Sequence, residues 1–140
     1  MNNELIIEFD GNMGSRVEFL DRLKKQLIDF LDDLVQVNVA VMFFKEIVKN
    51  IYDHAEGKGV MTLVKGERGI YFRIKDFGKE SYDFEILKTK GSSKAGNGTN
   101  FGIGLGLIEG MADGFGVIDF KIDCSKGFVY SGIYPYEARH

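Results

Sequence analysis

The chain has 140 residues, 44% of them hydrophobic and 13% aromatic, which is typical of one globular domain and excludes a disordered chain. Its formal net charge is −3, and no basic block indicates a nucleic-acid partner. No apolar run reaches the ~18 residues of a membrane span, and the N-terminus lacks the pattern of a signal peptide. The single cysteine, Cys124, excludes an intramolecular disulfide and a cysteine-based zinc site. We therefore expect one cytoplasmic domain over residues 1–140, with no membrane or nucleic-acid partner.

The spacing of apolar residues predicts three helices, five strands and one long loop. From Ser15 to Leu34 apolar residues recur at helical spacing and charged residues fill the gaps, as in an amphipathic helix with one buried face. In chain order we predict a strand at Leu5–Phe9, helices at about 15–34 and 38–55, strands at 60–64 and 70–75, a loop at 77–101, a short helix to about Asp113, and strands at 116–123 and 128–133. This order predicts an α+β fold, a two-layer sandwich in which helices cover one face of a mixed, mostly antiparallel sheet.

The second predicted helix carries a polar stripe. At about 100° per residue, Glu46, Asn50, Asp53 and His54 fall within one arc. A carboxylate and a carboxamide one turn apart could face a magnesium–nucleotide complex, because Mg²⁺ favours a few protein oxygens together with phosphates and waters. Glu46 could also orient or deprotonate an attacking water or hydroxyl. The same pattern suits an ordinary solvated helix face, and His54 suits a cap at the helix end.

An aspartate follows the third predicted strand. Asp76 follows the run Arg73-Ile74-Lys75, and Gly78 comes two residues later. A carboxylate there could accept a hydrogen bond from an exocyclic amine while the glycine leaves room for a planar ring. An Asp-x-Gly turn is the simpler interpretation. The protein-kinase Asp-Phe-Gly motif is rejected, because the lysine-bearing strand and catalytic loop of that fold are missing.

A glycine run, Gly102-Ile103-Gly104-Leu105-Gly106-Leu107, follows a polar segment over 90–101. We predict that the run opens a helix and presents backbone N–H groups to phosphate; alternatively, it is only a glycine-rich turn. It is not a P-loop, since Gly-x-x-x-x-Gly-Lys-Ser/Thr is absent. It also fails the Rossmann fingerprint, because Leu107 stands where that motif has Gly or Ala and a loop precedes the run.

Taken in order, these three segments resemble the motifs of the GHKL superfamily, whose ATP-binding domain has the Bergerat fold. Glu46-Ile47-Val48-Lys49-Asn50-Ile51-Tyr52-Asp53-His54 is similar to the N box, Asp76-Phe77-Gly78 to the first glycine box, and the glycine run to the second. The resemblance spans about 41–112, and the order of strands extends it over nearly the whole chain. It implies the Bergerat fold, with ATP and Mg²⁺ as cofactors.

The resemblance also implies a role for each matching residue. Glu46 would be the general base or water-orienting residue, Asn50 would hold Mg²⁺ through the nucleotide, and Asp76 would receive the adenine amino group. Residues 85–101 would form an ATP lid, in which Lys90 or Lys94 could reach a phosphate. The implied nucleotide-binding residues are Asn50, Asp53, His54, Asp76, Gly78, Lys94, Gly102, Ile103, Gly104, Leu105 and Gly106.

The chain departs from the family pattern at three positions. Glu80 replaces the second glycine of the first box, Gly127-Phe128 stands where a late Gly-Thr is usual, and Ile51 replaces a small residue. The first two departures bear on lid entry and adenine affinity, and the third on packing.

A free-standing domain of this size is most similar to the anti-sigma-factor serine/threonine kinases. The resemblance thus implies an ATP–Mg²⁺-dependent protein kinase that phosphorylates a small antagonist protein in a partner-switching system. A sigma factor or other regulator would be a further partner, and a homodimer is possible. Two alternatives stay open: a non-catalytic ATP-binding regulatory module, and a histidine-kinase-like ATP domain that acts on a separate phosphoacceptor.

Overall fold

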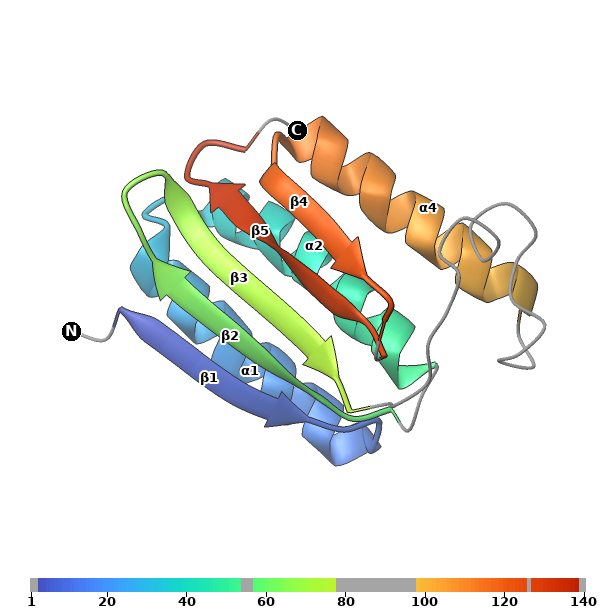
Figure 1. The fold of residues 1–140 in the computed structure, drawn as a ribbon. Helices are drawn as coiled ribbons and strands as arrows, with labels where there is room; N and C mark the ends of the chain where they lie inside the picture. The colour runs from blue at the N-terminus through green and yellow to red at the C-terminus, as the bar shows by residue number, and fades with distance from the viewer. Residues whose placement is uncertain (1–2, 54–56, 78–97, 126, 139–140) are drawn as a thin grey trace.

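The computed structural model describes residues 3–53, 57–77, 98–125 and 127–138. These residues form a five-stranded sheet and three helices, and Figure 1 shows the helices on one face of the sheet. The elements are β1 (Glu4–Phe9), α1 (Met13–Phe30), α2 (Leu34–Tyr52), β2 (Gly59–Lys65), β3 (Gly69–Asp76), α4 (Gly98–Phe115), β4 (Ile118–Asp123) and β5 (Val129–Pro135). The α+β class and the coverage of one sheet face by helices agree with the sequence-based prediction.

The strands lie in the order β1-β2-β3-β5-β4, and every neighbouring pair is antiparallel. The prediction of a mixed sheet was therefore wrong. The two helices α1 and α2 carry the chain along the sheet and back, so β2 starts beside the end of β1 and runs against it (Figure 1). Helix α4 precedes β4, which runs in the same direction as β3. The two strands are not neighbours, because β5 lies between them.

The core fills the space between the sheet and the helices. Along β1, β2 and β3 buried residues alternate with half-buried or exposed ones, as the period of a half-buried strand requires. On β3 the inward positions are Ile70, Phe72, Ile74 and Asp76, so a carboxylate ends an otherwise apolar row. Helix α2 is the central helix and contacts α1, α4 and β3. In the part of the chain that the structure describes, no helix has the length and apolar character needed to cross a bilayer.

The connection between α1 and α2 is earlier in the chain than predicted. Helix α1 ends at Phe30, and its last backbone hydrogen bond is the one that Leu31 N donates to Leu27 O, at 2.8 Å. Asp33 then caps α2, with its Oδ1 accepting from Val35 N at 2.8 Å. The prediction of one helix to Leu34 was wrong because Leu31 is buried and continues the apolar spacing beyond the end of the helix.

Candidate functional site

Asn50 is a buried polar residue of α2. Its side chain is only 7% exposed, and its Nδ2 donates a hydrogen bond of 2.9 Å to the hydroxyl of Tyr130 on β5. The predicted polar stripe is therefore divided: Asn50 is buried with Phe43 and Ile47, whereas Asp53 is exposed. A helix packed against a sheet and two other helices buries much of its circumference. The buried face of α2 is therefore wider than the apolar arc predicted from the sequence, and it includes Asn50.

The other atom of the Asn50 amide, Oδ1, points at α4. A Cβ added to Gly104 would lie 2.6 Å from this oxygen, which is closer than real Cβ contacts allow. Glycine at 104 thus lets the backbone of α4 come close to the carboxamide. The Tyr130 bond and the Gly104 backbone together hold Asn50 with its carbonyl oxygen toward the glycine-run helix.

Asp76 is the second buried polar residue of this region. Its side chain is 1% exposed because it occupies an inward position of β3. Its Oδ2 accepts from Phe128 N at 2.9 Å, and its own N donates to Phe128 O at 3.0 Å. This reciprocal pair fixes the carboxylate at the end of the sheet where β3 ends and β5 begins (Figure 1).

Tyr130 connects the two polar residues, and the sequence reasoning missed it. Burial raises the pKa of Tyr130; the hydrogen bond with Asn50 lowers that pKa, and the nearby Asp76 carboxylate raises it. Its ring also stacks on Phe128, at 6.1 Å between centroids. The spacing of two between Phe128 and Tyr130, which are both buried, was a signal that could have identified it.

The remaining predicted residues are distributed unevenly. Glu46 is half-buried on α2, one turn before Asn50. Asp53 lies at the C-cap of α2 and lines a cavity on the side of α1, away from Tyr130. Leu105 is fully buried in the core. Gly106 is exposed, and a Cβ added to it would lie more than 4 Å from the other described residues that it could meet. His54, Gly78 and Lys94 lie outside the described residues.

The glycine run lies inside α4 and does not open it. The helix begins at Gly98, so Gly102 and Ile103 already belong to its second turn and Gly104 and Gly106 follow. The prediction that the run starts the helix was wrong, because buried Leu105, Ile108 and Ala112 dock the segment as helix despite its glycines. Beyond the first four N–H groups, an α-helix pairs each amide with the carbonyl four residues back. In this conformation the amides of the run are engaged within α4.

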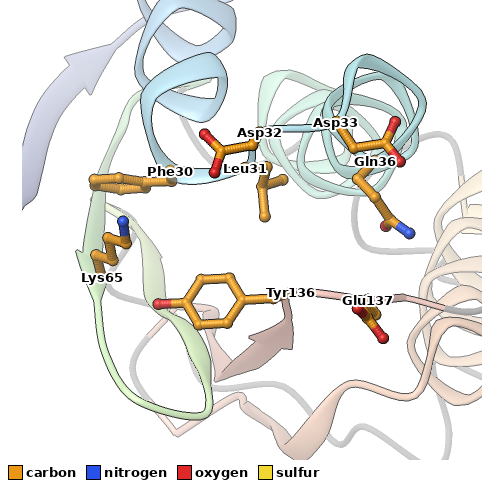
Figure 2. Close-up of a pocket in the computed structure, with 8 residues that line it drawn as sticks. All are labelled: Phe30, Leu31, Asp32, Asp33, Gln36, Lys65, Tyr136 and Glu137. Atoms are coloured by element: carbon orange, nitrogen blue, oxygen red, sulfur yellow. The ribbon is translucent and has the colours of Figure 1, made fainter.

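A larger cavity lies at the opposite end of the sheet, where β2 and β5 end and α1 gives way to α2. It measures about 560 Å³, and Figure 2 shows its lining by Phe30, Leu31, Asp32, Asp33, Gln36, Lys65, Tyr136 and Glu137. Gln36 is held there by reciprocal hydrogen bonds with the Ala138 backbone, at 3.4 and 3.2 Å. Three carboxylates against one ammonium make this cavity unfavourable for phosphate groups.

Comparison of the chain with family models, with curated proteins and with solved structures found no match. The resemblance to the GHKL superfamily thus rests on the three sequence segments.

Proposed function

We propose that the chain binds ATP and Mg²⁺ as a GHKL-type domain with the Bergerat fold, and that it acts as a protein serine/threonine kinase of the anti-sigma-factor type. One observation carries this proposal: residues from all three motif-like segments meet at one end of the helix–sheet core. Asn50 contacts Gly104 of the glycine run. Tyr130 accepts a hydrogen bond from Asn50, and the Asp76 carboxylate is close enough to raise the pKa of Tyr130. Segments separated by 20 or more residues meet there, which an accidental motif match would not require.

The residues present fit the proposed cofactors. Mg²⁺ prefers oxygen ligands and keeps few protein contacts, and Asn50 Oδ1 is such an oxygen, oriented by the bond from Nδ2 to Tyr130. Glycine at 104 keeps a side chain away from this oxygen, because a Cβ there would lie 2.6 Å from it. Asp76 is a buried acceptor, as recognition of an exocyclic amine requires.

In the proposed reaction, Mg–ATP supplies the transferable phosphoryl group and the metal neutralises its charge. Asn50 would orient the metal end of the nucleotide through Oδ1. Asp76 would select adenine through its amino group. Glu46, half-buried one turn before Asn50, would accept the proton of the substrate hydroxyl. The substrate would be a serine or threonine of a small antagonist protein, by the GHKL resemblance.

A second function is favoured by the position of the glycine run. Because the run lies within α4, its amides are engaged in helical hydrogen bonds rather than presented to phosphate. A chain that changes this helix on binding ATP could alter its affinity for a partner without phosphoryl transfer. This alternative is a non-catalytic ATP-binding regulatory module.

Titration of the chain with ATP and Mg²⁺ tests the nucleotide site. We expect binding by the wild type and a loss of about 10-fold or more for Asp76→Asn, which removes the acceptor charge but keeps the size. Asp29→Asn is the matched control, because Asp29 is an exposed carboxylate on α1. Equal ATP affinity in wild type and Asp76→Asn would rule out this site.

Incubation with ATP and a purified antagonist protein separates the two functions. Phosphoserine on the antagonist that disappears in Glu46→Gln supports the kinase, with Glu67→Gln in the β2–β3 turn as control. Intact ATP binding and partner switching without phosphate transfer support the regulatory module. Acid-labile phosphate on the partner would instead identify a histidine-kinase-like domain.

A further inference from the structure

A second, smaller cavity lies between α1 and α2 and carries the opposite charge to the one in Figure 2. It measures about 180 Å³, and its lining is Arg16, Phe19, Leu20, Lys45, Val48, Lys49, Tyr52 and Asp53. Phe19 and Val48 are buried and Leu20 is half-buried, so the floor of the cavity is apolar. Three cations and one carboxylate make the remaining lining net positive.

These cations are available to a ligand. In the described part of the chain, the ion pair within 4.0 Å joins Lys25 to Asp21, and neither Lys45 nor Lys49 has a carboxylate partner there. Both lysines are exposed and lie one turn apart on α2, so they are neighbours on the same face. Two unpaired like charges at this spacing repel each other, and an anion between them would relieve that repulsion.

Arg16 is fixed in a position that suits an anion. Its Nε donates to Gly11 O at 2.8 Å, and its guanidinium carbon lies 4.4 Å from the centre of the Tyr52 ring. A guanidinium has five N–H donors, so these contacts leave its terminal nitrogens with donors for a ligand. The Tyr52 hydroxyl is buried and has no hydrogen-bond partner among the described residues. Burial raises the pKa of Tyr52, and that hydroxyl therefore stays protonated near neutral pH.

We propose that the cavity between α1 and α2 binds a small organic anion, with its apolar body on Phe19, Leu20 and Val48 and its carboxylate or phosphate beside Arg16, Lys45 and Lys49. Its lining includes neither Asn50, which bonds Tyr130 and lies beside Gly104, nor Asp76, which bonds Phe128. The proposed site therefore does not depend on the proposed nucleotide site. Asp53 and the nearby Asp10 are the carboxylates that oppose the ligand charge. Their presence favours a singly or doubly charged ligand over a polyanion.

Methyl NMR of the full chain, labelled at leucine and valine, tests this site with four probes. Benzoate and phenyl phosphate carry both an apolar ring and a charge; benzamide lacks the charge, and inorganic phosphate lacks the ring. We expect both aryl anions to shift the methyl signals of Leu20 and Val48 and to bind about 10-fold more tightly than either partial probe. Leu31, which lines the acidic cavity, is the internal control and should not shift.

Two double variants examine the charge. Lys45→Gln/Lys49→Gln should weaken both aryl anions by about 10-fold. Arg73→Gln/Lys121→Gln removes the same charge from exposed positions of the sheet and should change the affinity by less than about twofold. Equal binding of benzoate and benzamide, or equal effects of the two double variants, would overturn the proposal.

A final variant keeps this inference distinct from the nucleotide site. Asp76→Asn should leave the binding of phenyl phosphate unchanged, whether or not ATP binds elsewhere. Loss of the Leu20 and Val48 shifts in Asp76→Asn would mean that the probe occupies the Asn50–Asp76 region, which would contradict a separate site.

Discussion

Tyr130 and Tyr134 lie four residues apart on the same face of β5, and both are fully buried beneath the helices. Tyr130 accepts a hydrogen bond from Asn50, whereas the Tyr134 hydroxyl has no partner among the residues that the structure describes. Around Tyr134 the neighbours are aromatic: Phe43 at 5.7 Å, Phe44 at 5.5 Å and Phe115 at 6.4 Å between ring centroids. The core thus has a polar half around Tyr130 and an aromatic half around Tyr134.

The aromatic half of the core packs rings against each other, whereas the polar half fixes the orientation of buried polar side chains. An unpaired buried hydroxyl costs about 1–3 kcal/mol, so Tyr134 is retained for its ring rather than for its oxygen. Tyr130 fixes the direction of a carboxamide, and Asp76 is held in the same half by Phe128. Buried polar groups with fixed geometry are typical of binding sites, and aromatic packing is typical of a stabilising core.

The largest expected effect is in the aromatic half. Phe44→Ala removes a fully buried ring that contacts Phe72 and Tyr134, and we expect the free energy of unfolding to fall by about 3–5 kcal/mol. Urea denaturation measures the change. ATP affinity, extrapolated to the folded fraction, should change little, because Phe44 lies outside the polar half. A loss of stability below about 1 kcal/mol would contradict the division of the core.

Removing each tyrosine hydroxyl compares the two halves directly. Tyr130→Phe leaves the buried Asn50 Nδ2 without its acceptor, so we expect a loss of about 1–3 kcal/mol in unfolding free energy. Tyr134→Phe removes a hydroxyl that has no partner in the described part of the chain, and stability should stay the same or rise by up to about 1 kcal/mol. If both variants lose the same stability, the two hydroxyls are equivalent and the comparison fails.

A pair of glycine variants tests the contact of α4 with Asn50. Gly104→Ala gains helix propensity, but its Cβ would meet Asn50 Oδ1 at 2.6 Å, so we expect a net loss of about 1 kcal/mol and weaker ATP binding. Gly110→Ala is the matched control on the same helix, where nothing lies within 4 Å, and it should gain about 0.5–1 kcal/mol. Urea denaturation measures whether each variant gains or loses stability. A gain in both variants would show that the Asn50 side chain moves aside at little cost, which would contradict the prediction.

The smallest expected effect is a loss of stability in alkaline solution, which is absent near neutral pH. Burial raises the pKa values of Tyr130 and Tyr134 above that of an unfolded tyrosine, which is about 10. Above pH about 10 the unfolded chain releases these protons first, so the free energy of unfolding should fall as the pH rises. Each Tyr→Phe variant should reduce this slope, and Tyr71→Phe, at an exposed position, is the control. Urea titrations between pH 8 and 11 measure the slopes, and an unchanged slope in both buried variants would contradict the expectation.

The sequence predicted the order and type of the helices and strands, because their apolar periods are clear. It failed where tertiary packing decided the outcome. Leu31 continues the helical period although the chain turns there to reach the Asp33 cap. The glycines of α4 predicted a helix start, yet the docking of Leu105 and Ile108 extends the helix back to Gly98.

The candidate site was predictable in part. The sequence identified Asn50, Asp76 and Gly104, and the structure brings them together around Tyr130. It did not indicate that Asn50 is buried while Asp53 is exposed, because the width of a buried helix face depends on how many neighbours it has. Tyr130 was missed because the resemblance draws attention to motifs, whereas its role comes from the register between β5 and α2.

Six of the 18 residues of α4 are glycine. Each glycine makes a helix about 0.8–1 kcal/mol less favourable than alanine would, so this segment has little tendency to be helical alone. Its ordered length is a local equilibrium, maintained by the burial of Leu105, Ile108 and Ala112 against the rest of the core. Modest binding energies are therefore sufficient to lengthen or shorten α4 at its first turns, where the glycine run lies beside Asn50.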